Sequence, residues 1–104
     1  MRKNQTQTLT AKCIINTLNT HKNEIQRYQV KKIGLFGSFL KGSQHTKSDL
    51  DFLVAFKDPT YDNYIELKFL LEKIFHKKID LVIEDNLKPA LQYVKEEAVY
   101  AKRV

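Results

Sequence analysis

The chain has 104 residues, 42% of them hydrophobic and 29% charged, and a formal net charge of +6 at pH 7. This size predicts one compact domain over residues 1–104, and the composition excludes a disordered or repeat protein. The apolar runs are too short to cross a membrane, and residues 1–8 are polar, which predicts a frayed start without a signal segment. We therefore expect a cytoplasmic protein.

The basic residues do not indicate a nucleic-acid surface, although Lys and Arg total 18. They are scattered along the chain instead of forming a block, and no basic segment is interleaved with aromatic side chains that could stack on bases. The pattern favours a solvated basic surface that attracts phosphates or acidic partners over dedicated nucleic-acid binding.

The first half of the chain predicts a helix and then two strands joined by a loop. The helix is expected over about Leu9–Tyr28. It carries the single cysteine, Cys13, which excludes an internal disulfide and which we expect to be a buried structural thiol. The apolar runs Val30–Phe36 and Asp51–Phe56 predict the strands.

The second half predicts a helix, a strand and a further helix. A wide apolar arc indicates a helix over about Thr60–Phe75, and the β-branched run Lys78–Ile83 predicts a strand. The last helix is expected to begin near Pro89, because proline is favoured in the first helical turn, and to run to about Tyr100. Helices and strands that alternate in this way predict an α/β fold.

A Gly-Ser pair, Gly37 and Ser38, comes directly after the first predicted strand. The chain is expected to turn here into a short helix. The free N–H groups at the start of that helix, together with the Ser38 hydroxyl, can hold phosphate oxygens. By itself such a pair is an ordinary turn, so its meaning depends on the acidic residues further along the chain.

Three aspartates complete the pattern. Ten residues separate Ser38 from Asp49. Asp49 and Asp51 open the second predicted strand and point to the same side, since residues i and i+2 of a strand share a face. Asp80 joins them if the third predicted strand pairs beside the second. Three carboxylates make an all-oxygen site that selects Mg²⁺ or Mn²⁺ over Zn²⁺. Two such ions, about 3.5–4 Å apart, would activate an incoming hydroxyl and hold a triphosphate.

This spacing resembles the signature of the DNA polymerase beta-type nucleotidyltransferase superfamily, and within it the minimal nucleotidyltransferase (MNT) domain is most similar. The likeness covers nearly the whole chain. It implies a small mixed β-sheet backed by helices, ATP as substrate, and two Mg²⁺ or Mn²⁺ ions. Lys41 stands where many members have Arg, so a bidentate contact would become a point charge. The implied catalytic and metal-binding residues are Asp49, Asp51 and Asp80, and the implied nucleotide-binding residues are Gly37, Ser38, Lys41 and Ser48.

The predicted elements leave no segment to build an acceptor pocket, so the acceptor must be held by another chain in a homo- or hetero-oligomer. The MNT resemblance implies a HEPN-domain toxin as the partner, and an antitoxin that transfers AMP from ATP to a tyrosine of that toxin. Two alternatives stay open. The chain could block the toxin sterically without catalysis, which the three clustered acids argue against, or it could serve as the catalytic subunit that nucleotidylates a small molecule or an RNA end.

Overall fold

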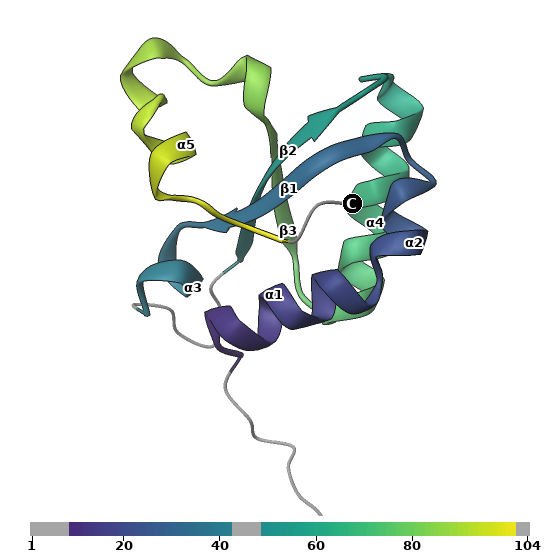
Figure 1. The fold of residues 1–104 in the computed structure, drawn as a ribbon, viewed down its shortest axis with the longest axis horizontal. Coiled ribbons are helices and arrows are strands. Elements are labelled where there is room, and N and C mark those ends of the chain that lie inside the picture. Colours follow the sequence, from purple (N-terminus) through teal and green to yellow (C-terminus); the bar gives the residue numbers. More distant parts are fainter. Residues whose placement is uncertain (1–8, 43–48, 102–104) are drawn as a thin grey trace, which may run out of the picture.

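The computed structural model describes residues 9–42 and 49–101, and within them a four-stranded mixed sheet forms the centre (Figure 1). The strand order is β3-β2-β1-β4. β2 pairs antiparallel with β1 and parallel with β3, while β4 pairs antiparallel with β1. The predicted mixed α/β sheet is therefore confirmed. The strands are β1 Val30–Phe36, β2 Leu50–Phe56, β3 Ile79–Ile83 and β4 Val99–Tyr100.

One face of this sheet carries the hydrophobic core. Alternate residues of β2, namely Leu50, Phe52 and Val54, are fully buried there, as the period-2 geometry of a strand requires. Helices α1 (Ala11–Thr20), α2 (Lys22–Gln26) and α4 (Tyr61–Phe75) cover this face. Their buried contributions to the same cluster are Ile14, Leu18, Ile25, Leu67, Leu71 and Phe75.

The prediction of one long helix at the start was wrong, because the chain forms α1 and α2 with a break at His21. The last turn of α1 contains Thr17 and Thr20, whose hydroxyls donate to backbone carbonyls four residues earlier at 2.8 and 3.0 Å. Such back-bonding weakens a helix. After the break, His21 Nδ1 lies 2.6 Å from Glu24 Oε1, and this contact supports the first turn of α2.

The predicted burial of Cys13 was also wrong, since its thiol side chain is exposed. The buried positions of α1 are Ile14 and Leu18, which lie four residues apart on one stripe. Cys13 precedes that stripe by one residue, or about 100° around the helix. The helix begins where the Thr10 hydroxyl accepts a hydrogen bond from the Cys13 N–H at 3.1 Å.

Helix α4 confirms its prediction closely. The Thr60 hydroxyl caps its start by accepting the Asn63 N–H at 3.1 Å. The helix ends at Phe75, before His76 takes a left-handed conformation with φ 55°. Among the described residues, no helix is long and apolar enough to span a bilayer.

The predicted last helix was wrong in extent. The chain forms short 3₁₀ turns at Glu84–Asn86 and Pro89–Leu91, then α5 (Tyr93–Glu97), and finally β4. Figure 1 shows this segment arching away from the sheet and returning to it along β1. A long-range contact explains the return, since the Tyr100 ring lies over Gly34, where an added Cβ would come 2.8 Å from the ring.

The buried carboxylate of Glu84 also holds strand β4 in place, through Tyr100. The Tyr100 hydroxyl donates to Glu84 Oε2 at 2.9 Å, and Lys32 Nζ lies 3.4 Å from that oxygen. Burial and the hydrogen bond to Glu84 raise the pKa of Tyr100 to about 12. Glu84 is only 9% exposed, so its charge is stabilised by these two partners instead of by water.

We predict that Gly34→Ala lowers the free energy of unfolding by about 1–3 kcal/mol, because the new methyl group meets the Tyr100 ring. Urea denaturation measures this. In a Tyr100→Ala background the same substitution should cost much less, since the ring is gone. An equal cost in both backgrounds would show that β4 does not depend on this contact.

Candidate active site

The predicted site residues come from three neighbouring strands at one end of the sheet. In the strand register, Phe36 at the end of β1 pairs with Asp51 near the start of β2, and Asp51 pairs with Asp80 near the start of β3. Gly37 comes directly after Phe36. The predicted pairing of the Asp80 strand beside the Asp51 strand is confirmed, so Gly37, Asp51 and Asp80 lie in one row across the sheet.

Gly37 is in van der Waals contact with the Asp51 carboxylate. An added Cβ at this glycine would lie 2.9 Å from Asp51 Cγ and closer still to Oδ2. The backbone also has φ 81° and ψ −155°, a conformation that side-chain-bearing residues rarely adopt. Only glycine meets both demands, so the chain can turn into α3 (Ser38–Lys41) directly beside the carboxylate.

Of the four predicted nucleotide-binding residues, the structure describes Gly37, Ser38 and Lys41. Ser38 is half-buried at the start of α3, and Lys41 lies in its last turn. Lys41 Nζ is 3.8 Å from Glu97 Oε1, an ion pair that links α3 to α5. Ser48 lies outside the described residues.

A second cation near α3 was missed from the sequence. Lys77 lies two residues before β3, far from Phe39 in sequence. Its Nζ is nevertheless 5.5 Å from the centre of the Phe39 ring in α3. Its place three residues before Asp80 was the only available signal. The chain therefore brings two lysines, Lys41 and Lys77, to the short helix that begins after Gly37.

The three acids act on one another electrostatically. Partial burial of Asp51, then the charge and hydrogen bond of Asp80, then the charge of Asp49 raise the pKa of Asp51 to about 6. An acid whose pKa is raised in this way is one whose anionic form lacks a compensating cation. In residues 9–42 and 49–101 no three His, Cys, Asp or Glu side chains are already arranged to hold a metal ion. The donor set, carboxylate oxygens under mutual repulsion, nevertheless fits a hard divalent cation.

The chain belongs to the nucleotidyltransferase domain family, whose match covers residues 18–104. It is 38% identical over 95 residues to the protein adenylyltransferase MntA of Thermococcus cleftensis. The aligned region covers 88% of this chain and 96% of that relative. The chain is thus a nucleotidyltransferase, and the resemblance to MNT domains is confirmed.

Solved structures agree with this assignment. One structure, described as a minimal nucleotidyltransferase, matches with a TM-score of 0.68 at 32% identity. The match covers 82% of this chain and 93% of the chain in that structure. A toxin–antitoxin structure with AMP-PNP has a TM-score of 0.64 at 26% identity, covering 83% of this chain and 70% of that one. The sheet and its helices therefore have the minimal nucleotidyltransferase fold.

The raised pKa of Asp51 predicts a pH-dependent stability effect. Its folded value, about 6, lies above the ordinary 3.8, so folding favours the protonated form. The resulting penalty is absent below pH 3.8, grows as the pH rises, and is complete above pH 6. We expect Asp51→Asn to stabilise the protein at pH 8 by on the order of 1 kcal/mol, allowing for solvent screening of this part-exposed group.

Thermal unfolding at several pH values measures the effect. The gain should shrink toward zero as the pH falls to 4, because wild-type Asp51 is then protonated. Asp85→Asn, at an exposed acid away from the row, is the matched control and should show no such trend. A gain for Asp51→Asn that is independent of pH would contradict the electrostatic cause.

Proposed function

We propose that this chain is a metal-dependent protein adenylyltransferase that transfers AMP from ATP to a tyrosine hydroxyl of a HEPN-type toxin and so acts as its antitoxin. The observation that carries the proposal is the row formed by Gly37, Asp51 and Asp80. It places the glycine turn that begins α3 directly beside paired carboxylates. Support comes from the name of the MntA relative and from the toxin–antitoxin structure with AMP-PNP.

The residues of the row have separate roles in this proposal. Gly37 allows the chain to turn into α3 beside Asp51, and the Ser38 hydroxyl donates to a phosphate oxygen, while Lys41 adds positive charge nearby. Asp49 and Asp51 would hold both ions, and Asp80 would hold the ion on the acceptor side. Bound Mg²⁺ or Mn²⁺ would neutralise the triphosphate and lower the pKa of the acceptor hydroxyl.

The transfer itself is a substitution at the α-phosphorus. A bond forms from the tyrosine oxygen to that phosphorus, and the bond to the β-phosphate bridge breaks, so that pyrophosphate leaves. The tyrosine proton is lost to solvent or to a nearby carboxylate. The chain contributes position and charge compensation, which is sufficient for phosphoryl transfer.

We predict that Asp49→Asn abolishes AMP transfer by orders of magnitude with the fold intact, because it removes a ligand at nearly constant volume. The protein is co-expressed with the product of the neighbouring gene, and that product is weighed by intact mass spectrometry. AMP-sized additions should appear with wild type and with the control Asp85→Asn, and should vanish with Asp49→Asn.

The same experiment separates the alternative functions. If the toxin is neutralised without a mass change, and equally well by Asp49→Asn, the protein is a steric antitoxin. If no protein gains mass but a small molecule or an RNA end does, the chain is the catalytic subunit of a different transferase.

We predict that Asp80→Asn loses transfer but keeps most of its affinity for Mg²⁺ and a non-hydrolysable ATP analogue. Asp49 and Asp51 remain to hold the ion on the triphosphate, whereas the acceptor-side ion loses a ligand. Isothermal titration calorimetry measures the affinity, and Asp51→Asn is the comparison. Equal loss of nucleotide affinity in both variants would contradict this division of roles.

A further inference from the structure

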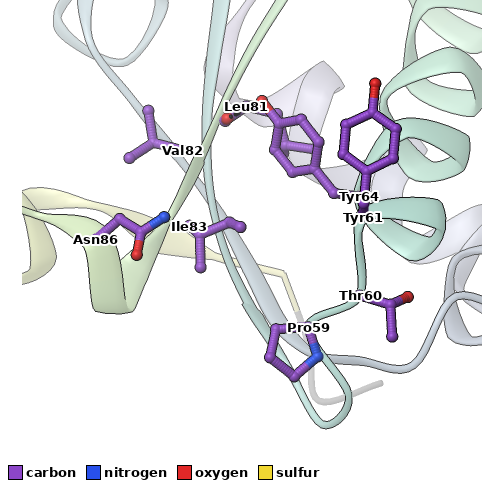
Figure 2. Close-up of a pocket in the computed structure, with 8 residues that line it drawn as sticks. All are labelled: Pro59, Thr60, Tyr61, Tyr64, Leu81, Val82, Ile83 and Asn86. Carbon is purple, nitrogen blue, oxygen red and sulfur yellow. Dashed lines mark hydrogen bonds between the residues drawn. The ribbon is translucent and has the colours of Figure 1, made fainter.

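The two edges of the sheet offer different contacts to a ligand. Beside β3, one of the edge strands, lies a hollow with a volume of about 570 Å³. Figure 2 shows the rings of Tyr61 and Tyr64 side by side on its α4 wall, with Leu81 and Ile83 on the β3 wall. In the described part of the chain eight residues line this hollow, and none of them is charged. The other edge strand is β4, and the segment that leads into it forms an ion pair with α3.

The register of β4 against β1 brings the end of α5 level with the glycine turn. Val99 lies opposite Leu35, and the two strands are antiparallel. Ala98, which precedes Val99, has an extended backbone with φ −63° and ψ 141°. Continued by two residues, the same register sets Glu97 level with Gly37. This puts Glu97 next to the Gly37 end of the row of site residues.

The side chain of Glu97 meets Lys41 at the same place. Its Oε1 lies 3.8 Å from Lys41 Nζ, which belongs to the last turn of α3. Within residues 9–42 and 49–101 this is the one ion pair that Lys41 forms. The lysine and glutamate side chains are 62% and 49% exposed, so both can change partner without disturbing the core. A triphosphate that uses Lys41 therefore has to compete with the Glu97 carboxylate.

The backbone on either side of Glu97 is hydrogen-bonded. Val94 is buried, and its carbonyl accepts the Ala98 N–H at 2.9 Å at the end of α5. Beyond β4, the Ala101 N–H donates to the Ile33 carbonyl at 2.9 Å. These bonds fix the place of Glu97 beside α3. They do not involve the Glu97 side chain, so the ion pair can break while they stay intact.

We propose, building on the proposed function, that Glu97 is a positioning residue that holds Lys41 in the free protein and releases it when ATP binds. A triphosphate carries several negative charges and attracts Lys41 more strongly than one carboxylate does. Breaking the ion pair costs free energy, which lowers the affinity for the nucleotide. By linkage, ATP binding weakens the contact between α3 and α5. The chain thus transmits nucleotide occupancy to its C-terminal segment.

Binding of Mg²⁺ and the α,β-methylene analogue of ATP, whose α–β bridge resists transfer, tests the proposal by isothermal titration calorimetry. Glu97→Gln removes the charge at nearly constant volume. The dissociation constant should then fall about threefold, as expected for the loss of one screened surface ion pair. Lys41→Met should raise the dissociation constant. In the Lys41→Met background, Glu97→Gln should change it by less than about 1.5-fold, because no lysine is left to release.

The matched control is Glu96→Gln, which makes the same change in net charge one residue earlier in α5. Glu96 forms no ion pair among the described residues, so this variant should change the dissociation constant by less than about 1.5-fold. Thermal unfolding confirms that every variant is folded. The proposal would be overturned by no fall with Glu97→Gln, by an equal fall with Glu96→Gln, by an undiminished fall in the Lys41→Met background, or by unchanged affinity in Lys41→Met.

The amide signals of α5 give a second measurement. A ¹⁵N NMR spectrum of free Lys41→Met shows where the Tyr93 and Val94 signals move when the ion pair is absent. Saturating the wild-type protein with Mg²⁺ and the analogue should move the same signals in the same direction, since both changes break the same contact. Signals of α5 that do not move in the saturated wild type would also overturn the proposal.

The outcome is separable from that of the proposed function. Binding of the analogue needs no acceptor, so a chain that shows this pattern of affinities but AMPylates nothing would refute only the enzyme role. Where transfer occurs, Glu97→Gln should lower the KM for ATP about threefold, a change that a purely structural substitution would not make. Transfer with an unchanged KM for ATP would refute the role of Glu97 alone.

Discussion

The register of β1, β2 and β3 is the constraint on which the rest of the structure depends. Leu50, Phe52 and Val54 are fully buried on one face of β2, so Asp51 must point to the other face. A slip by one residue would turn the carboxylate toward the core and turn Phe52 away from it. The apolar core therefore positions the acids, and the pairing of Asp51 with Phe36 and Asp80 brings the Gly37 turn and β3 to the same place.

That position has a cost which the core must offset. Gly37 contacts the Asp51 carboxylate, and Asp80 and Asp49 add like charge around it. Partial burial of Asp51 and this repulsion lower the stability of the folded protein at neutral pH, and a bound cation would relieve both. In the proposed function, stability and cation binding would be coupled at one side chain, because the arrangement that weakens the free protein also fits a divalent cation.

Local patterns predicted the parts of the fold that local interactions determine. The three main strands result from apolar runs, and α4 from its apolar arc and the Thr60 cap. The break at His21, the exposure of Cys13 and the end of the last helix were missed. The last of these depends on Tyr100 packing over Gly34, a contact between residues far apart in sequence. For the site, the spacing of the motif predicted the acids. The Lys41–Glu97 ion pair and the contact of Lys77 with Phe39 could not be predicted, because each joins residues far apart in sequence.

Two lysines lie close to one end of the row of site residues. Lys41 and Lys77 lie at α3, on the side where the row begins with Gly37, whereas the row ends with the exposed Asp80. A triphosphate would be drawn to the Gly37 end of this row. In-line displacement at phosphorus requires the incoming oxygen and the leaving pyrophosphate to lie on opposite sides of the reacting atom. With the triphosphate held at the Gly37 end, an acceptor that approaches from the Asp80 end would meet this geometry.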